Sequence, residues 1–250
     1  MCGRYAAKKD PATLADEFDA VDATGPEHPG PDYNVAPTKQ VFTVVERHPR
    51  DEEGTADPER TERSIRLMKW GLVPYWAKDP SVGNRMINTR SESAAEKPAF
   101  KTALARRRCL LPADGWYEWR RDGKTKQPFY MTSTDGSTLA LAGIWSTWRP
   151  KDADAAEPPL VTCSILTTDA VGPLSEIHDR MPLVLPPEAW SRWLDPEREN
   201  VAELLAPPPA ELVGALELRP ISDEVNNVRH NGPTLLERVE PDPPVQATLL

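Results

Sequence analysis

The sequence predicts a single α+β domain in which short strands outnumber helices. With 250 residues, 39% of them hydrophobic and 28% charged, the chain is long enough to bury a sizeable core and too apolar to be mostly disordered. Its 28 prolines, about twice the usual share, favour turns and short elements over long helices. Because no internal repeat or sharp change of composition divides the chain, we expect one core.

Apolar or alternating runs bounded by turn residues predict a series of strands. These strands are expected at residues 41–45, 65–72, 109–112, 116–120, 128–132, 139–145 and 160–167. Asp-Gly pairs at 122–123 and 135–136 predict turns.

Helical spacing is confined to a few short segments. A helix is expected over residues 14–20 with Thr13 as its N-cap, because threonine is a favoured capping residue. Further helices are expected within residues 93–108, after Pro98, and at residues 187–194 and 201–205.

Two segments are expected to lie outside the packed body. Residues 46–63 are charged and rich in turn residues, which predicts a loop insertion or hairpin tip between two strands. Residues 236–250 are rich in proline and acids, so we expect a flexible tail after a domain that spans residues 1–235.

The composition also narrows the class of protein. No apolar run approaches the ~20 residues needed to cross a bilayer, and the first ten residues lack an apolar signal core, so we expect no membrane partner. Three cysteines are too few and odd in number for a disulfide framework, which favours a cytoplasmic location. Cys109 and Cys163 lack metal-ligand spacing and lie in apolar runs, so we expect core positions, no metal site and no cofactor.

The charge is unevenly distributed. The chain carries a net charge of −9, yet residues 66–108 contain ten basic and three acidic residues, a surplus of +7. A local basic face on an acidic body suits an anionic ligand, whereas dispersal of these charges over the fold is the alternative.

Cys2 has the most distinctive chemistry in the sequence. Removal of Met1 would leave an α-amine with a pKa of about 7.7–8.0 and a thiol with a pKa of about 8.5 on adjacent carbons. Such an amine forms a Schiff base with an aldehyde, and the thiol then closes onto the imine carbon to give a five-membered thiazolidine. Arg4 lies two residues away, where its cation favours the thiolate and can hold a phosphate. The alternative is an incidental cysteine at a frayed terminus.

Polar side chains also gather among aromatic residues in three short segments. These are INTRSES, with Asn88 and Arg90, ADGWYEWR, with Glu118, and EIHDRMP, with His178. A carboxylate among aromatic rings tends toward a raised pKa, which suits acid–base work near neutrality. Each residue taken singly also has a structural interpretation: Glu118 as the outward-facing residue of an alternating strand, and His178 as a hydrogen-bonded histidine in a turn.

The segment WGLVPYW contains Trp70 and Trp76 close to basic residues. Aromatic rings in such a setting stack on unpaired bases. Because a tryptophan is more often a core residue, we expect only one of the two to contact a ligand.

Seven motifs, in order over residues 1 to about 235, resemble those of the SRAP family (SOS response-associated peptidase, also called abasic site processing proteins). They are MCGRY (1–5), YNVAPT (33–38), WGLVPYWA (70–77), INTRSE (87–92), DGWYEW (114–119), IHDRMPLVL (177–185) and VNNVRHNGP (225–233). The resemblance implies an α+β fold with a curved, barrel-like mixed β core, flanking short helices and a positive groove. The implied activity is covalent capture of abasic sites in single-stranded DNA, including those at single-strand/duplex junctions, by a monomer.

The resemblance also implies roles for individual residues. Cys2 would form the thiazolidine with the ring-opened deoxyribose aldehyde, and Asn88 would position this terminal residue. Glu118 would open the sugar ring and serve the imine chemistry as general acid–base, with His178 assisting proton transfer. At the DNA-binding site, the resemblance implies phosphate contacts for Arg4 and Arg90, base stacking for Trp76, and supporting polar contacts for Asn34 and Thr167.

Two other functions stay open at the level of sequence. The N-terminal cysteine with Glu118 and His178 also suits an N-terminal-nucleophile peptidase, whose removal of Met1 would be autocatalytic. A protein that binds single strands reversibly, with Cys2 incidental, is the non-enzymatic alternative. A lyase side reaction by β-elimination is expected wherever thiol closure is slow.

Overall fold

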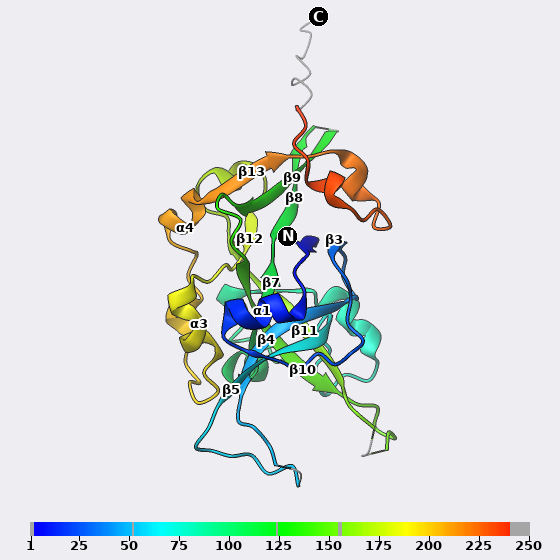
Figure 1. Cartoon of the computed structure of the whole chain (residues 1–250), viewed down its shortest axis with the longest axis vertical. Coiled ribbons are helices and arrows are strands. Elements are labelled where there is room, and N and C mark those ends of the chain that lie inside the picture. The colour runs from blue at the N-terminus through cyan, green and yellow to red at the C-terminus, as the bar shows by residue number, and fades with distance from the viewer. Residues whose placement is uncertain (1–2, 52, 124, 155–156, 241–250) are drawn as a thin grey trace, which may run out of the picture.

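The computed structural model of the chain describes residues 3–51, 53–123, 125–154 and 157–240 and is built mainly of strands (Figure 1). The strands are β1 (Tyr5–Ala7), β2 (Val21–Asp22), β3 (Asp32–Val35), β4 (Gln40–Arg47), β5 (Glu62–Trp70), β6 (Asn88–Arg90), β7 (Arg108–Ala113), β8 (Gly115–Asp122), β9 (Thr125–Ser133), β10 (Leu139–Trp148), β11 (Leu160–Asp169), β12 (Arg180–Pro182) and β13 (Leu216–Pro220). One sheet has the order β13-β9-β8-β1-β3, and the other has the order β12-β11-β10-β7-β4-β5-β2, with β6 added beside β11.

The larger sheet curls back on itself. Its strands β5 and β11 stand far apart in the strand order, yet they pair in parallel at Lys69↔Thr162 and Trp70↔Cys163. The sheet is mixed, because β2 also runs parallel to β5 and β6 parallel to β11, whereas its other pairs are antiparallel. This arrangement confirms the expected α+β fold with a curved, barrel-like β core.

Strands of the curled sheet bury both of their faces, which explains their nearly continuous apolar sequences. Alternate residues of β10 pack into two different core clusters, with Leu141 and Trp145 in one and Ala142 and Ile144 in the other. The first cluster fills the inside of the curl. Gly143 belongs to that inner face, where an added Cβ would come within 2.4 Å of the Leu111 side chain.

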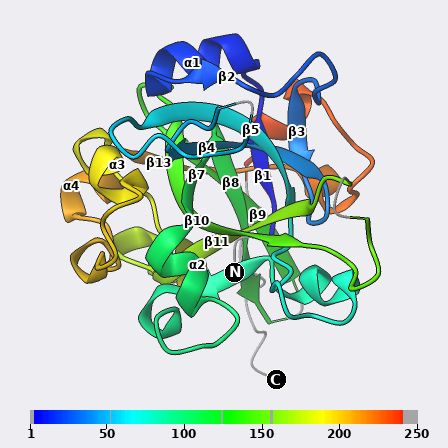
Figure 2. The ribbon, with the colours of Figure 1, turned by 90° about the horizontal axis from the view of Figure 1, so that it is seen from below.

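Short helices cover the outside of the curled sheet (Figures 1 and 2). They are α1 (Pro11–Phe18), α2 (Lys101–Arg106) and α3 (Pro187–Leu194), whereas α4 (Ala210–Gly214) buries Val213 in the first cluster. Phe18 of α1, Leu104 of α2 and Trp193 of α3 are buried in the outer core cluster. None of the helices in the described part of the chain is long and apolar enough to span a bilayer.

Three helix predictions need correction. The first helix starts earlier than expected, because the side chain of Asp10 caps it by accepting the Thr13 N–H and Pro11 occupies its first turn. The helix expected within residues 93–108 is only α2, because Arg108 already begins β7. Residues 201–205 form a single 3₁₀ turn at Ala202–Leu204.

The expected longer strands are all present, and several are longer than expected. The charged segment 46–63 was expected to be a loop, but its first and last two residues belong to the β4–β5 hairpin, which pairs as far as Arg47↔Glu62. Residues 48–61 connect the two strands. The sequence did not predict strands β1, β2, β3, β6, β12 and β13, because their two to five residues are too few to show an alternating pattern.

Residues 236–240, assigned to the tail, still contact the body. Leu236 packs beside the cluster that contains Tyr130 and Ile221, and Arg238 forms an ion pair with Glu217 at 2.7 Å. The ordered body therefore extends at least to Arg238. The rest of the expected tail, residues 241–250, lies outside the described residues.

Candidate functional site

The first strand of the chain enters the molecule beside Glu118. β1 pairs with β8 through Tyr5↔Trp116, and the Tyr117 N–H donates to the Arg4 carbonyl at 3.0 Å. Continuing this antiparallel register by one residue sets Gly3 opposite Glu118. Cys2 lies outside the described residues.

Glu118 is a buried carboxylic acid in the middle of β8. Its side chain is 3% exposed, and its neighbours Trp116 and Tyr117 are fully buried. Burial raises the pKa of Glu118 from the usual 4.5 to about 7, and the negative charge of Asp179 adds to the rise. Both protonation states are therefore populated near neutrality, which suits a group that gives and takes a proton.

His178 precedes β12 in a turn that faces the same region. Burial lowers the pKa of His178, so the neutral ring predominates at pH 7. In the neutral ring Nδ1 accepts the Arg180 N–H at 2.9 Å, which leaves the proton on Nε2. The Nδ1 atom also lies 2.7 Å from Asp179 Oδ1, a pairing that requires a protonated ring. We assign the neutral form at rest, with Asp179 in position to stabilise the imidazolium when His178 takes up a proton.

Arg180 joins two of the sequence motifs. Its guanidinium, 6% exposed, donates to both oxygens of Glu92 at 2.8 and 2.9 Å and to the Thr167 carbonyl at 2.7 Å. It also contacts Asp169 at 2.5 Å. Sequence reasoning placed Glu92 and Arg180 in separate polar clusters and missed that they pair, because residues 88 positions apart give no local signal.

Asn88 and Arg90 lie on β6, which pairs in parallel with β11 at Ile165↔Asn88 and Thr167↔Arg90. Alternation along this strand leaves Asn88 half-buried and Arg90 exposed, with Thr89 buried between them. Strand β12, which begins two residues after His178, pairs with β11 from Thr167 to Asp169. Strands β6 and β12 therefore both lie beside the same end of β11.

Asn34 lies inside the protein and supports Arg4. It is fully buried, and its amide donates to the carbonyls of Val225, Asn227 and His230 at 3.0–3.3 Å. Its Oδ1 accepts a 2.6 Å hydrogen bond from Arg4. A side chain with no exposed surface does not contact DNA, so Asn34 instead fixes Arg4 and the 225–230 segment in place.

Thr167 also lies inside the protein. This residue is fully buried in β11, and its carbonyl is the acceptor for Arg180. Thr167 therefore supports the guanidinium that holds Glu92, and its side chain is not available to DNA.

The tryptophan expectation fits the structure. Trp70 is fully buried, with its Nε1–H donating to the Ile87 carbonyl at 2.9 Å, whereas Trp76 is 53% exposed. Sequence reasoning missed Tyr75, which is 66% exposed beside Trp76. The loop after β5 therefore exposes two aromatic rings to solvent. Trp148 Nε1 anchors this loop by donating to the Ala77 carbonyl at 2.7 Å.

The basic stretch 66–108 does not form one face. Arg108 is 4% exposed and donates to backbone carbonyls that include those of Trp193 and Leu104, so it is a structural residue. Arg106 pairs with Glu199. Only part of the expected positive charge is therefore available near Arg90.

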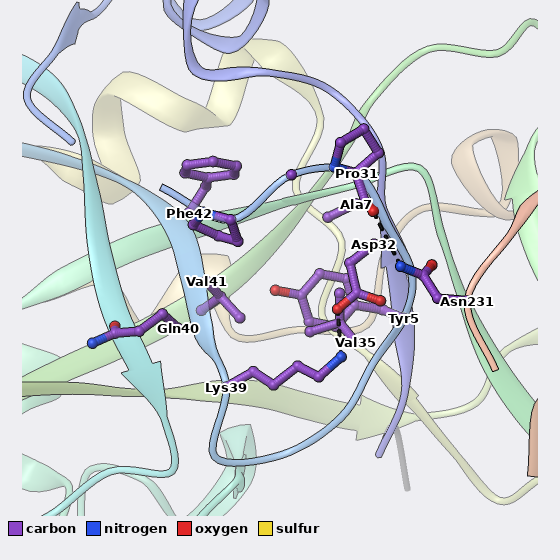
Figure 3. Close-up of a pocket in the computed structure, with 12 residues that line it drawn as sticks. Tyr5, Ala7, Pro31, Asp32, Val35, Lys39, Gln40, Val41, Phe42 and Asn231 are labelled. Atoms are coloured by element: carbon purple, nitrogen blue, oxygen red, sulfur yellow. Dashed lines mark hydrogen bonds and ion pairs between the residues drawn. The ribbon is translucent and has the colours of Figure 1, made fainter. Parts of the chain in front are cut away.

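A cavity of about 530 Å³ lies on the other side of β1 from Glu118, among β1, β3 and β4 (Figure 3). Tyr5, Val41 and Phe42 form its apolar wall, and an ion pair of 2.6 Å between Lys39 and Asp32 stands at its edge. The cavity is not lined by Asn88, Glu118 or His178, the expected catalytic residues that the structure describes.

The internal cysteines are core residues, as expected. Cys109 and Cys163 are fully buried in the curl, and burial raises the pKa of both thiols. No group of three or more His, Cys, Asp or Glu side chains suited to a metal ion occurs among the described residues.

The fold and the site together define a class of α+β proteins in which a buried acid lies on the strand that pairs with the first strand of the chain. The chain belongs to the SRAP family: the family model described as SOS response associated peptidase (SRAP) matches residues 1–228. It is 35% identical to abasic site processing protein YedK of Escherichia coli, with 96% of this chain and 100% of that protein covered. It is 34% identical to abasic site processing protein YoqW of Bacillus subtilis, with 95% and 99% covered.

A solved structure has the same fold. A crystal structure of a protein from Bacteroides thetaiotaomicron aligns with a TM-score of 0.79 at 23% identity and covers 96% of this chain and 100% of that one.

Proposed function

We propose that this protein processes abasic sites by capturing their ring-opened aldehyde in single-stranded DNA through Cys2. Relatives named abasic site processing proteins support the substrate, because the chain matches them over almost its full length. The observation that carries the mechanism is the buried Glu118, with a pKa of about 7, on the strand that pairs with the start of the chain.

The chemistry requires an amine and a thiol close to this acid. Continuing the β1–β8 register sets Gly3 opposite Glu118. Cys2 is bonded to Gly3, and the Cα atoms of consecutive residues are about 3.8 Å apart. Removal of Met1 exposes the α-amine of Cys2.

Each step has a proton donor or acceptor. The abasic sugar is mostly a closed hemiacetal, and Glu118 in its acid form protonates the ring oxygen as the C1′ hydroxyl loses its proton, giving the aldehyde. The Cys2 amine adds to the aldehyde carbon, and loss of water gives the imine. The thiol then adds across the C=N bond, with its proton passing to nitrogen, so aldehyde and aminothiol become thiazolidine and water.

Neighbouring groups assist this sequence. Neutral His178 takes up a proton at Nδ1 and gives up the hydrogen bond from the Arg180 N–H, and Asp179, 2.7 Å from Nδ1, then stabilises the charged ring. Asn88 positions the terminal residue from β6, and the exposed Arg90 and the half-buried Arg4 hold the flanking phosphates. Exposed Trp76 stacks on an unpaired base beside the site.

The test is a denaturing gel of the purified protein incubated with a single-stranded oligonucleotide that carries one abasic site, with intact masses of protein and product. We expect a shifted band whose mass is the sum of both minus one water, with Met1 absent. An otherwise identical oligonucleotide without the abasic site should give no shifted band.

Variants separate the alternatives. Cys2→Ser keeps an amine but loses the thiol, so the adduct resistant to heat and denaturant should disappear and strand cleavage by β-elimination should rise. Glu118→Gln should slow adduct formation about 100-fold, whereas Glu96→Gln at an exposed position should not. A heat-stable adduct with Cys2→Ser, or retention of Met1 in the adduct, would refute the thiazolidine. Cleavage of peptide bonds other than that of Met1 would favour the peptidase.

A further inference from the structure

A groove lies between strands β5 and β11 of the curled sheet. Strands β5 and β11 pair only at Lys69↔Thr162 and Trp70↔Cys163, and residues before these pairs diverge. The space between them is about 830 Å³ and is lined by β4, β5, β10 and the start of β11, with residues 23–24 at one side. We call this the arginine groove after four of its lining residues: Arg47, Arg50, Arg66 and Arg149.

The arginine groove lies away from the candidate active site. Arg47 ends β4 and Arg149 follows β10, and Figure 1 shows the β4–β5 and β10–β11 connections at the end of the molecule opposite β8 and β9. Glu118 is on β8, in the other sheet. A DNA segment held at Glu118 alone therefore does not account for this groove.

Three of the four arginines bring positive charge to the groove that no acid among its described lining residues balances. Among the described residues, no aspartate or glutamate lines it, and Arg47, Arg50 and Arg66 take part in no ion pair. Arg66 donates to the Ser64 hydroxyl at 3.0 Å, and Arg50 donates to the Gly54 carbonyl. By contrast, Arg63 on the same strand as Arg66 pairs with Glu46 at 3.0 Å, outside the groove.

The floor of the groove keeps these charges close together. Trp145 is 6% exposed, with the Arg47 guanidinium 5.0 Å from the centre of its ring and that of Arg107 at 5.5 Å. Burial, followed by repulsion from Arg66, Arg50 and Arg107, lowers the pKa of Arg47. Like charges held together in this way favour a bound anion.

We propose that the arginine groove binds the phosphodiester backbone of a nucleic-acid strand at a second place, remote from the abasic site. Several observations favour a strand over a single phosphate. The guanidinium groups come from separate segments around an 830 Å³ groove, a space larger than one phosphate needs, so different arginines contact different phosphates of one strand. Threonines 24 and 147 add hydroxyl groups to the lining. Since arginines already cover Trp145, bases do not stack there, and binding is independent of sequence.

The test uses reversible binding of a fluorescent 20-nucleotide single strand without an abasic site, so it is independent of the covalent chemistry. The variant is Arg47→Gln with Arg66→Gln, two exposed positions outside the proposed catalytic machinery. Each lost phosphate contact on a single strand lowers the salt dependence by about 0.7. We expect about tenfold weaker binding at 0.1 M salt and a slope of log K against log salt that is shallower by about 1.4.

A matched control removes the same charge elsewhere. Lys101→Gln with Arg192→Gln lies on the exposed faces of α2 and α3 and should leave affinity and slope unchanged. Equal effects in both double variants would show a general charge effect and overturn the proposal, as would an unchanged slope in the groove variant. A 20-base-pair duplex and ATP are measured alongside, and preferential weakening of ATP binding would overturn the assignment to a strand.

A second measurement covers the case in which the groove variant does not fold. The wild-type protein is treated with an arginine-specific dicarbonyl reagent, and modification is mapped by peptide mass spectrometry. Bound oligonucleotide should protect Arg47 and Arg66 but not Arg192, and equal modification with and without DNA would refute the proposal. If the abasic oligonucleotide gave no covalent adduct while this protection persisted, the proposed function would fail and the groove would stand.

Discussion

Replacing Glu118 by glutamine tests the central electrostatic feature of the site. The substitution keeps the shape of the side chain and removes its ability to ionise. Glu118 has a pKa of about 7 in the folded protein, against 4.5 for an ordinary glutamic acid. A difference of about 2.5 units corresponds to about 3 kcal/mol between the two protonation states.

The direction of the pH dependence follows from this shift. Between pH 4.5 and 7 the folded state retains a proton on Glu118 that the unfolded chain has lost. The stability due to the neutral acid is therefore fully present below about pH 4.5 and is lost as the pH rises through about 7. The glutamine variant has no such loss. It should match the wild type at pH 4.5 and be more stable by about 3 kcal/mol at pH 9.

Urea unfolding monitored by tryptophan fluorescence at pH 4.5, 7 and 9 measures this difference. Glu96→Gln, at an exposed position, is the control and should show no change with pH in its difference from the wild type. A constant difference between Glu118→Gln and the wild type across this range would refute the raised pKa. Loss of cross-linking by Glu118→Gln together with a gain in stability would separate a catalytic role from a structural one.

Three further substitutions test the packing and the surface of the site. Gly115→Ala should cost about 3 kcal/mol in the free energy of urea unfolding, because the added Cβ would lie 2.3 Å from a carbonyl of β9, whereas Gly214→Ala meets nothing within 4 Å and should be neutral. Asn34→Ala should cost about 2 kcal/mol and expose the 225–230 segment to limited proteolysis, which Asn84→Ala at an exposed position should not do. Trp76→Ala should weaken binding of single-stranded DNA by about 1–3 kcal/mol in fluorescence anisotropy without lowering the melting temperature.

The strand pattern was predictable because its cause is local. Runs such as Leu139–Trp148 and Leu160–Asp169 are rich in β-branched and aromatic residues and end in turn residues, so their conformation follows from nearest neighbours. The strands that escaped prediction have no such local cause. β6 is three residues long and is a strand only because β11 lies beside it.

The same distinction between local and non-local causes applies to the residues of the site. The sequence alone was enough to select Glu118 and His178 as candidates, because a polar group among aromatic residues is a local signal. Burial is not local, since a strand with both faces covered gives no sign of which side chains are accessible. That Asn34 and Thr167 are fully buried was therefore not predictable from the sequence.

What the sequence by itself determined is the order of strands and turns, the family motifs and the chemical identity of the groups at the site. Only the tertiary structure decided that Arg180 pairs with Glu92, that Arg108 is buried, and that Arg66 lines a groove at the far end of the molecule. The physical reason is that pairing, desolvation and clustering of charge depend on distances through space, and closure of a sheet brings together residues that are far apart along the chain.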